Sequence, residues 1–254
     1  MPETELLVTE VFSAIQGEAA MVGHRQVFVR LAGCNIRCAY CDQPEALEAR
    51  PGPCRLERTP GRRDWARRAS PLPIPDVVEA ADRLWRALPH HSVSLTGGEP
   101  LFQAARLAVL APRLVERGHR LALETNGMLT HGLARVLPWL AHVSMDVKLS
   151  SVDGQGVALD AHAAFLRAAG AGPAGIAVKI VLGPATDDRE LDAAVAMVAA
   201  ESPDATVYLQ PVTPFGAVTD APIPGQVLAW QELALRRHPQ VRVVPQTHKL
   251  LGQL

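Results

Sequence analysis

Three of the four cysteines are spaced so that they could hold one metal cluster. Cys34, Cys38 and Cys41 form a C-x3-C-x2-C pattern, and Cys54 follows 13 residues later. Thiolates are soft ligands that suit iron–sulfur clusters and zinc. A structural zinc site or a ferredoxin cluster takes four protein ligands, whereas three cysteines leave one iron open to bind a substrate. We therefore expect a cluster on these three cysteines and expect Cys54 to be a loop thiol without a catalytic role.

Other polar motifs fall where predicted strands end. They are Thr96-Gly-Gly-Glu-Pro100, Glu124-Thr-Asn-Gly127, Asp146-Val-Lys148, Gln210-Pro211 and Gln246-Thr-His248. Parallel α/β folds place their ligand sites at the carboxyl ends of the strands. We therefore expect these motifs and the cysteine motif to converge on one pocket.

Strands and helices alternate along most of the chain. Apolar runs predict strands at 27–31, 92–96, 120–125, 143–147, 176–182, 207–210 and 241–244, and helical spacing predicts helices at 76–88, 101–117, 130–140, 160–169, 187–200 and 225–238. This alternation is typical of a parallel α/β sheet. We expect an α/β fold, a partial (βα) barrel of parallel strands similar to a TIM barrel. An open doubly wound sheet also fits, because the sequence does not fix the strand order.

We expect residues 1–254 to form a single domain that carries a loop insertion at about 44–75. The insertion is rich in proline and glycine and contains the basic residues Arg62, Arg63, Arg67 and Arg68. Such a run of charge is typical of a solvated face.

Composition excludes several classes of partner. Hydrophobic residues make up 48% of the chain, which is enough to bury a core. The formal net charge is −1, so general electrostatic binding to nucleic acid is not expected. No apolar run approaches the roughly 20 residues that cross a bilayer. The first ten residues include Glu3, Glu5 and Glu10, which do not fit a signal peptide. We expect a cytoplasmic protein with no nucleic-acid or membrane partner.

The cysteine motif, followed by Gly97-Gly98-Glu99, resembles the radical S-adenosylmethionine (SAM) superfamily. The resemblance implies a [4Fe–4S] cluster on Cys34, Cys38 and Cys41, whose open iron chelates SAM. It also implies a fold of the radical SAM type and cleavage of SAM to a 5′-deoxyadenosyl radical.

Further segments resemble the 7-carboxy-7-deazaguanine synthase family nearly from end to end. They are Phe12-Ser-Ala-Ile-Gln-Gly-Glu18, Phe28-Val-Arg-Leu-Ala-Gly-Cys34-Asn, Cys41-Asp42 and Pro245-Gln-Thr-His248. The resemblance implies a lyase that converts 6-carboxy-5,6,7,8-tetrahydropterin to 7-carboxy-7-deazaguanine with loss of ammonia. The product would feed the biosynthesis of queuosine and other deazapurines. It further implies a homodimer and a flavodoxin-like or ferredoxin-like electron donor.

The resemblance also assigns roles to individual residues. The expected SAM-binding residues are Tyr40, Cys41, Asp42, Gly98, Glu99, Asp146, Val147 and Lys148. The expected substrate-binding residues are Ile15, Gln16, Gly17, Glu18, Arg30, Thr96, His248 and Leu254. An amide and a carboxylate can bind the donor and acceptor edge of a pterin, and a guanidinium can clamp its carboxylate.

Two segments depart from the family pattern. The family has Thr after Cys-Asp, where its hydroxyl helps to hold Mg2+, and this chain has Gln43. The side-chain oxygen of glutamine can bind Mg2+, so Gln43 is a possible Mg2+ ligand, although its side chain is longer than that of threonine. The chain also has Asp146-Val-Lys148 where Ser-Pro-Lys is expected.

Two other functions share part of this evidence. A glycyl-radical-enzyme activating enzyme has the same cysteine motif but does not need the Gln16-Gly-Glu18 segment or the Pro245-Gln-Thr-His248 ending. A non-enzymatic α/β module could hold zinc on the three cysteines, with Cys54 or a histidine as the fourth ligand.

Overall fold

The computed structural model describes residues 4–156, 158–215 and 217–253. Its strands are β1 (Glu5–Leu6), β2 (Val8–Ile15), β3 (Arg25–Leu31), β4 (Gly52–Glu57), β5 (Trp65–Ser70), β6 (Leu72–Pro73), β7 (Ser92–Gly97), β8 (Leu121–Thr125), β9 (Leu140–Val147), β10 (Gly175–Leu182), β11 (Thr206–Pro211) and β12 (Val241–Val243). Its α-helices are α1 (Ile74–Ala87), α2 (Ala104–Glu116), α3 (Thr130–Val136), α4 (Ser150–Asp153), α5 (Leu159–Gly170), α6 (Asp188–Glu201), α7 (Pro224–Leu235) and α8 (Thr247–Leu250).

Ten of the described strands build one large sheet in the order β12-β11-β10-β9-β8-β7-β3-β2-β4-β5, and β1 and β6 form a separate two-stranded sheet. Strands β3 and β7 to β12 are parallel, β2 runs antiparallel to β3, and the β4–β5 hairpin extends the β2 edge. Strands β12 and β5 lie at opposite ends of the order, so the curved sheet does not close into a barrel. The predicted α/β fold with parallel strands is confirmed.

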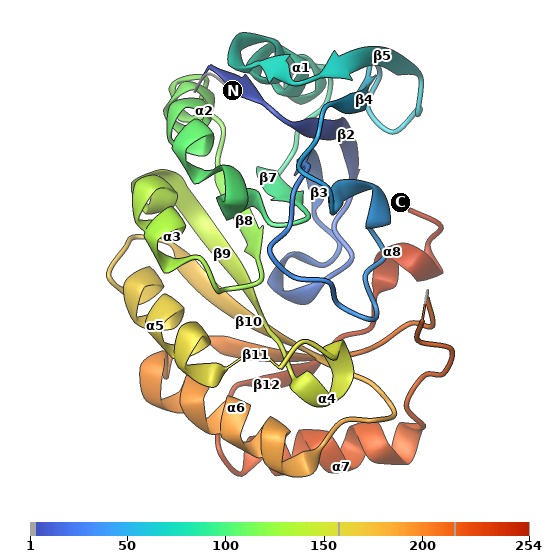
Figure 1. Cartoon of the computed structure of the whole chain (residues 1–254), viewed down its shortest axis with the longest axis vertical. Helices are drawn as coiled ribbons and strands as arrows, with labels where there is room; N and C mark the ends of the chain where they lie inside the picture. Colours follow the sequence, from blue (N-terminus) through green and yellow to red (C-terminus); the bar gives the residue numbers. More distant parts are fainter. Residues whose placement is uncertain (1–3, 157, 216, 254) are drawn as a thin grey trace.

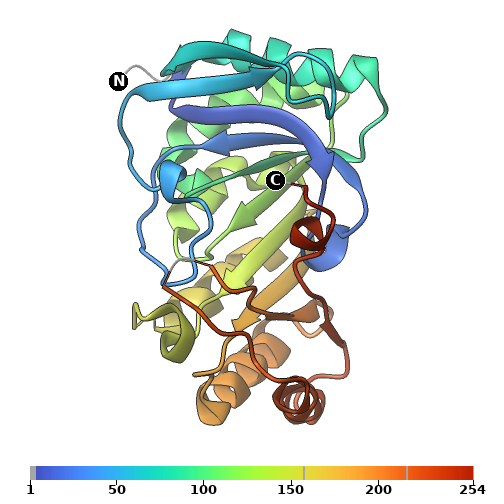
Figure 2. The same cartoon turned by 90° about the vertical axis from the view of Figure 1, so that its right-hand side faces the viewer.

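The helices cover one face of the sheet, and loops cover the other. Figure 1 shows α2, α3, α5, α6 and α7 following one another around the outside of the curved sheet. Figure 2 shows the C-terminal segment lying beside the N-terminal strands on the other face. No described helix has the length and apolar character needed to cross a membrane.

Alternating side chains on each strand separate the core from the inner face. On β3, Val27, Val29 and Leu31 are buried in the core, while Gln26 and Arg30 line a cavity on the opposite face. Successive side chains of a strand point to opposite faces of the sheet. The sheet therefore presents one apolar face to the helices and one face with polar side chains to the cavity.

The expectation that residues 44–75 form a loop is wrong, because this segment contains the strands β4, β5 and β6. Strands β4 and β5 pair antiparallel, β2 pairs with β4, and β6 pairs with β1 before α1 begins at Ile74. Arg67 and Arg68 lie on the edge strand β5, where exposed charge discourages pairing with another sheet. The strands were not predicted because the segment is rich in arginine and proline. An exposed edge strand does not require the apolar residues by which a buried strand is predicted.

Cys54 is also placed differently from expectation. It lies in β4, not in a loop, and its side chain is fully buried in the core. Burial raises the pKa of its thiol to about 12. Cys54 does not line the cavity that the other three cysteines share, so it supplies no fourth ligand there.

Candidate functional site

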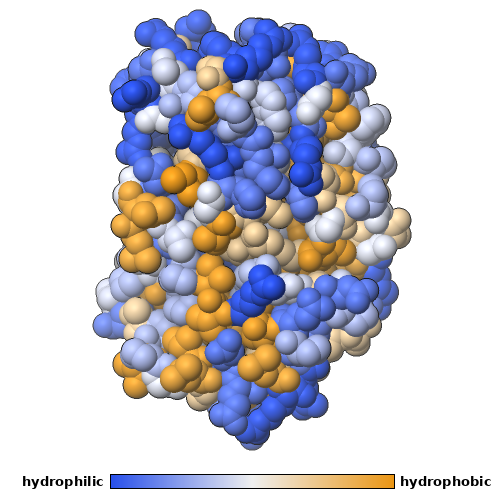
Figure 3. All heavy atoms as spheres, turned by 180° about the vertical axis from the view of Figure 1, so that it is seen from behind, coloured by the Kyte–Doolittle hydropathy of each residue, from blue (hydrophilic) through white to orange (hydrophobic). Residues whose placement is uncertain are grey.

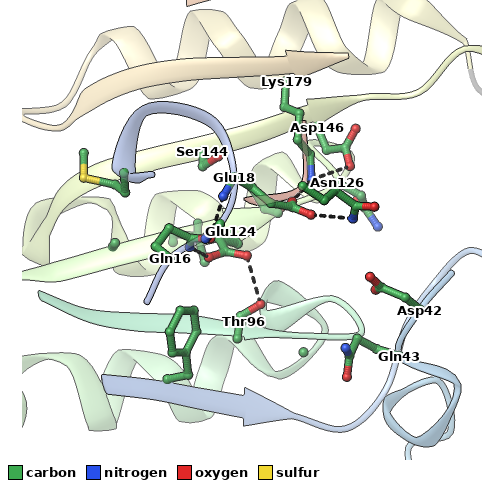
Figure 4. Close-up of a pocket in the computed structure, with 18 of the residues that line it drawn as sticks. Gln16, Glu18, Asp42, Gln43, Thr96, Glu124, Asn126, Ser144, Asp146 and Lys179 are labelled. Carbon is green, nitrogen blue, oxygen red and sulfur yellow. Dashed lines mark hydrogen bonds and ion pairs between the residues drawn. The ribbon is translucent and has the colours of Figure 1, made fainter. Parts of the chain in front are cut away.

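A cavity of about 370 Å³ lies on the inner face of the sheet. Strands β2, β3 and β7 to β11 line its wall, and the cysteine loop and the C-terminal segment line its mouth. The residues expected at the site that line it are Ile15, Gln16, Gly17, Glu18, Arg30, Cys34, Cys38, Tyr40, Cys41, Asp42, Gln43, Thr96, Gly98, Asp146, Lys148 and His248. Figure 4 shows several of these side chains pointing toward one another from separate strands and loops.

The cysteine loop is braced by its own backbone and by Arg37. The Cys41 amide donates to the Cys38 carbonyl at 3.1 Å, and the Arg37 guanidinium donates to the Cys34 carbonyl at 2.9 Å. Arg37 also binds Glu48 at 3.0 Å. The four cysteines, all within the described residues, are free thiols. Burial raises the pKa of Cys34, and raises that of Cys38 to about 11.

The three thiols fit an iron–sulfur cluster in residue type and in placement. No three described His, Cys, Asp or Glu side chains are already gathered into a metal-binding group. The thiols therefore have to turn toward a common centre as a cluster assembles. Such coupling of metal binding to local ordering is usual, because thiolates form and ordering occurs when the metal binds.

Gly98 packs the strand end of β7 against the cysteine loop. The Gly98 amide donates to the Leu31 carbonyl at 3.1 Å. A Cβ at this position would lie 2.6 Å from the carbonyl oxygens of Ala46 and Gly33. Only glycine allows this approach, so the backbone of residue 98 stays open to the cavity.

Lys148 links the cysteine loop to β9. Its Nζ lies 2.7 Å from Asp146 Oδ2 and 3.1 Å from the Tyr40 hydroxyl. Burial would lower the pKa of Lys148, but the neighbouring Asp146 carboxylate outweighs it and the pKa is raised. Burial also raises the pKa of the Tyr40 hydroxyl. At neutral pH the site therefore presents an ammonium and a neutral phenol.

Lys179 joins two carboxylates from different parts of the chain. Its Nζ lies 2.5 Å from Glu18 Oε2 and 3.3 Å from Asp146 Oδ2. Gln246 donates to Glu18 Oε1 at 2.8 Å. Burial would raise the pKa of Glu18, but Lys179 and Gln246 outweigh it and lower the pKa to about 2. Glu18 is therefore held as a carboxylate inside the cavity.

Glu124 ties together three neighbouring elements. It accepts hydrogen bonds from Gln16 Nε2 at 2.5 Å, Ser94 Oγ at 3.0 Å and Thr96 Oγ1 at 3.2 Å. Gln16 Oε1 in turn accepts from the amide nitrogens of Gly17 and Glu18. The Gln16 side chain thus shapes the turn that carries Glu18, and the Glu124 carboxylate faces the cavity beside it (Figure 4).

Comparison with known proteins agrees with this geometry. The family model described as "Radical SAM superfamily" matches residues 29–198. The chain is 41% identical over 248 residues to the 7-carboxy-7-deazaguanine synthase of Geobacter sulfurreducens, covering 96% of each chain. The chain belongs to the 7-carboxy-7-deazaguanine synthase family.

Other relatives cover less of the chain or share only its fold. The 7-carboxy-7-deazaguanine synthase of Methanothermobacter thermautotrophicus is 38% identical over 143 residues, which is 56% of this chain and 49% of that protein. The crystal structure of QueE from Escherichia coli superposes with a TM-score of 0.63 at 22% identity, covering 95% of this chain and 94% of that one. At that identity the likeness supports the fold.

Two described residues that the family resemblance placed at the site do not line the cavity, and a third lies outside the described residues. Val147 points into the core between Asp146 and Lys148, as alternation along β9 requires. Glu99 is fully buried, and its carboxylate accepts hydrogen bonds from the Leu101 amide, the Thr125 hydroxyl and the Asn126 amide. Leu254 lies outside the described residues.

Glu99 therefore braces the strand ends in this synthase-family chain. Burial raises the pKa of Glu99 to about 7, against the opposing effect of the hydrogen bonds from Asn126, Leu101 and Thr125. Those bonds join the turn after β7 to the end of β8. The Glu99 carboxylate holds the Gly-Gly-Glu turn from the side away from the cavity, and Gly97 and Gly98 of that turn line the cavity.

Sequence analysis missed Lys179, Glu124 and Gln246 as site residues. Lys179 carried a usable signal, because a lysine inside the apolar run 176–182 is costly to bury without a partner. Glu124 and Gln246 belong to motifs noted at strand ends, but only the structure shows which members face the cavity.

Arg30 lines the cavity but is already paired. Its Nε lies 2.7 Å from Glu10 Oε1, and its guanidinium lies 5.4 Å from the centroid of the Phe12 ring. Glu10 therefore fixes the guanidinium plane and compensates the charge of Arg30 when no anion is bound. The expected role of Arg30 in binding a carboxylate stays a prediction.

Gly17 sets the distance between the N-terminal turn and α8. The Thr247 amide donates to the Gly17 carbonyl at 3.0 Å, and a Cβ on residue 17 would lie 2.2 Å from His248 Nδ1. We expect Gly17→Ala to push α8 away and to weaken substrate binding about tenfold or more, since this clash involves backbone as well as side chain. Binding measured by isothermal titration would test it, with Gly52→Ala as the control for a general glycine effect, because an added Cβ there meets nothing within 4 Å and the backbone does not have a positive φ.

Proposed function

We propose that this protein is a radical SAM lyase that converts 6-carboxy-5,6,7,8-tetrahydropterin to 7-carboxy-7-deazaguanine with loss of ammonia. The product would enter queuosine and deazapurine biosynthesis. One observation carries the proposal: the three motif cysteines and the Glu18, Thr96, Glu124 and His248 side chains line the same cavity. A redox cluster and a polar pocket for a pterin would then face one another within a chain of this family.

The residues at the cysteine end fit the two cofactors. Cys34, Cys38 and Cys41 would hold the [4Fe–4S] cluster, and the Gly98 backbone and the Tyr40–Lys148–Asp146 group would contact SAM. When bound, SAM supplies the 5′-deoxyadenosyl radical that removes the hydrogen at C6 of the substrate. The Lys148 ammonium can attract a carboxylate, and Asp146 Oδ1, which is buried without a hydrogen-bond partner, can accept from a donor group.

The other end of the cavity offers groups suited to a pterin. The Glu18 carboxylate is ionised and can accept from the amino groups of the ring, and Glu124 provides a second acceptor beside Thr96. Arg30 would bind the substrate carboxylate, and His248 would close the pocket from α8. Phe12 and Phe28 stack at 5.1 Å between ring centroids and line the same wall, which keeps water from part of the pocket.

The function is tested by an anaerobic assay of reconstituted protein with SAM, reductant and 6-carboxy-tetrahydropterin, followed by mass spectrometry. Formation of 7-carboxy-7-deazaguanine is the expected result. Accumulation of 5′-deoxyadenosine without that product would show radical chemistry on another substrate, as in an activating enzyme. A purified sample with zinc and no iron or sulfide would instead support the binding module.

Partners and organisation follow as further parts of the proposal. We propose a flavodoxin-like or ferredoxin-like electron donor, a cytoplasmic location and a single domain. The single domain is supported by one core cluster that extends from Leu6 to Val241.

We also propose a homodimer. Figure 3 shows hydrophobic residues gathered on part of the rear face, and the exposed apolar side chains include Ile223, Leu228, Leu235, Leu250 and Leu251. Light scattering after size-exclusion chromatography measures the oligomeric state.

A further inference from the structure

The chain has three lysines among 25 basic residues, and each of them pairs with a carboxylate that lines the cavity. The pairs are Lys148 with Asp146 at 2.7 Å, Lys179 with Glu18 at 2.5 Å, and Lys249 with Asp42 at 3.0 Å. Arginine supplies the remaining basic residues of the chain. Each of the three lysines thus neutralises a carboxylate that lines the cavity.

Asp42, the partner of Lys249, directly precedes Gln43, the position at which the family resemblance implies a Mg2+ ligand. That ion requires near-octahedral oxygen ligands at about 2.0–2.1 Å and is usually held by one or two carboxylates together with substrate and water. Here Asp42 Oδ2 already binds the Lys249 ammonium. A divalent cation at Asp42 would lie beside a positive charge, which repels it.

The neighbouring described residues do not supply a second carboxylate that is free to replace Asp42. Gln43 stands where a threonine hydroxyl is expected, and its longer side chain lines the cavity beside Asp42 (Figure 4). The remaining cavity carboxylates already have partners. Glu18 pairs with Lys179, and Asp146 pairs with Lys148 and Lys179. Glu124 accepts hydrogen bonds from Gln16, Ser94 and Thr96. The residues present do not fit Mg2+.

Lys249 is held firmly enough to act as a fixed charge. The side chains of Lys249 and Asp42 are 16% and 24% exposed, so water screens the pair less than it screens a surface pair. Lys249 Nζ also lies 5.4 Å from the centroid of the Phe215 ring, a favourable cation–π distance. Helix α8, which carries Lys249, is anchored by the hydrogen bond from the Thr247 amide to the Gly17 carbonyl.

We propose that Lys249 takes the place of a divalent cation at Asp42, so that this protein binds its anionic substrate without Mg2+. Lys249 does not line the cavity, so it is a positioning residue: it neutralises Asp42 from behind and keeps that carboxylate from repelling a bound anion. The identity of the anion as a carboxylated tetrahydropterin rests on the proposed function. The exclusion of the metal does not rest on it.

Mn2+ is a suitable probe, because it prefers the same hard oxygen ligands as Mg2+ and is detected directly by electron paramagnetic resonance. The measurement uses the reconstituted protein with SAM and 6-carboxy-tetrahydropterin present and no reductant. We expect no bound Mn2+ in the wild type and stoichiometric binding in Lys249→Met, where Asp42 is released. Bound Mn2+ in the wild type, or none in Lys249→Met, would overturn the proposal.

Substrate affinity gives a second readout. In EDTA, we expect Lys249→Met to bind the tetrahydropterin about tenfold more weakly than the wild type, because Asp42 is then an uncompensated charge beside the bound anion, and we expect Mg2+ to restore the affinity. Lys249→Arg keeps a cation and should bind without a response to Mg2+. The double variant Lys249→Met/Asp42→Asn should lose the gained metal site. A wild-type affinity that rises with Mg2+ would contradict the inference.

The two proposals can fail separately. If the wild type excludes Mn2+ and Lys249→Met gains it, but no 7-carboxy-7-deazaguanine forms in any assay, the role of Lys249 stands and the proposed reaction does not. If product forms only with Mg2+, the reaction stands and the role of Lys249 does not.

Discussion

Alanine at Cys34, Cys38 or Cys41 is expected to remove the cluster and, with it, all product above background. The three thiols line one cavity, and with only two of them a [4Fe–4S] cluster would have two irons without a protein ligand. Each variant should lose the absorption at roughly 410 nm expected of a cluster held by thiolates. Iron and sulfide analysis of the reconstituted protein gives the same result independently of activity.

Cys54→Ala is the matched control for these three variants. Its thiol is fully buried in β4 and lies outside the cavity, so the cluster should remain intact. The variant should lose only about 1 kcal/mol in the free energy of unfolding, a typical effect of a small change in the core. A Cys54→Ala protein without its cluster absorption would contradict the assignment of the three ligands.

The parallel strands of the sheet were predicted from local patterns of apolar residues. All seven predicted strands correspond to β3 and β7 to β12, because these strands are buried and therefore rich in apolar residues. Strand β2 was missed as a strand, and its turn was recognised only through Gln16-Gly-Glu18. Its pairing with β3 is antiparallel and with β4 parallel, and nothing in the local sequence indicates that arrangement.

The candidate site was predictable where spacing alone decides the chemistry. Cys34, Cys38 and Cys41 fall into this class. So do Asp146 in β9 and Lys148 directly after that strand, which lie on the same side by simple alternation. Glu99 and Glu124 show where the sequence is insufficient. Both carboxylates lie near strand ends, but Glu99 faces backbone amides of its own chain and Glu124 faces the cavity. That difference depends on how the Gly-Gly turn redirects the chain.

The sequence predicted that distant motifs converge on one pocket, but not which residues of those segments contact each other. Gly17 meets His248, Glu18 meets Lys179 and Gln246, and Asp42 meets Lys249. Each pair depends on the C-terminal segment or β10 lying against the turn after β2 or against the cysteine loop. Such pairings follow from the whole topology, so a single sequence carries no local signal for them.

Lys179→Met is expected to destabilise the protein by about 3–5 kcal/mol at neutral pH, the usual cost of leaving one buried charge without its partner. The substitution keeps most of the side-chain volume but leaves Glu18 without its cation and removes one of the two lysines beside Asp146. Substrate affinity should fall as well, because Glu18 would then favour its protonated form. Urea unfolding and titration of the tetrahydropterin measure the two effects.

The pH dependence of this loss has a definite sign. In the wild type the pKa of Glu18 is lowered from 4.5 to about 2, so its contribution to stability is present above about pH 4.5 and is lost as the pH falls toward 2. Without Lys179, burial dominates and the pKa of Glu18 rises. The difference in unfolding free energy between wild type and Lys179→Met should therefore be largest near pH 7 and smaller at pH 4, where Glu18 of the variant is neutral.

A double variant separates the lost ion pair from a general loss of packing. In Lys179→Met/Glu18→Gln both charges are removed, and a neutral amide can still accept from Gln246. Replacing both partners of a buried pair costs far less than replacing one, so the double variant should recover most of the stability that Lys179→Met loses. Recovery of stability without recovery of substrate affinity is expected, because only an ionised Glu18 binds the ring donors strongly. If the two single substitutions instead added without coupling, Lys179 would not be acting through Glu18.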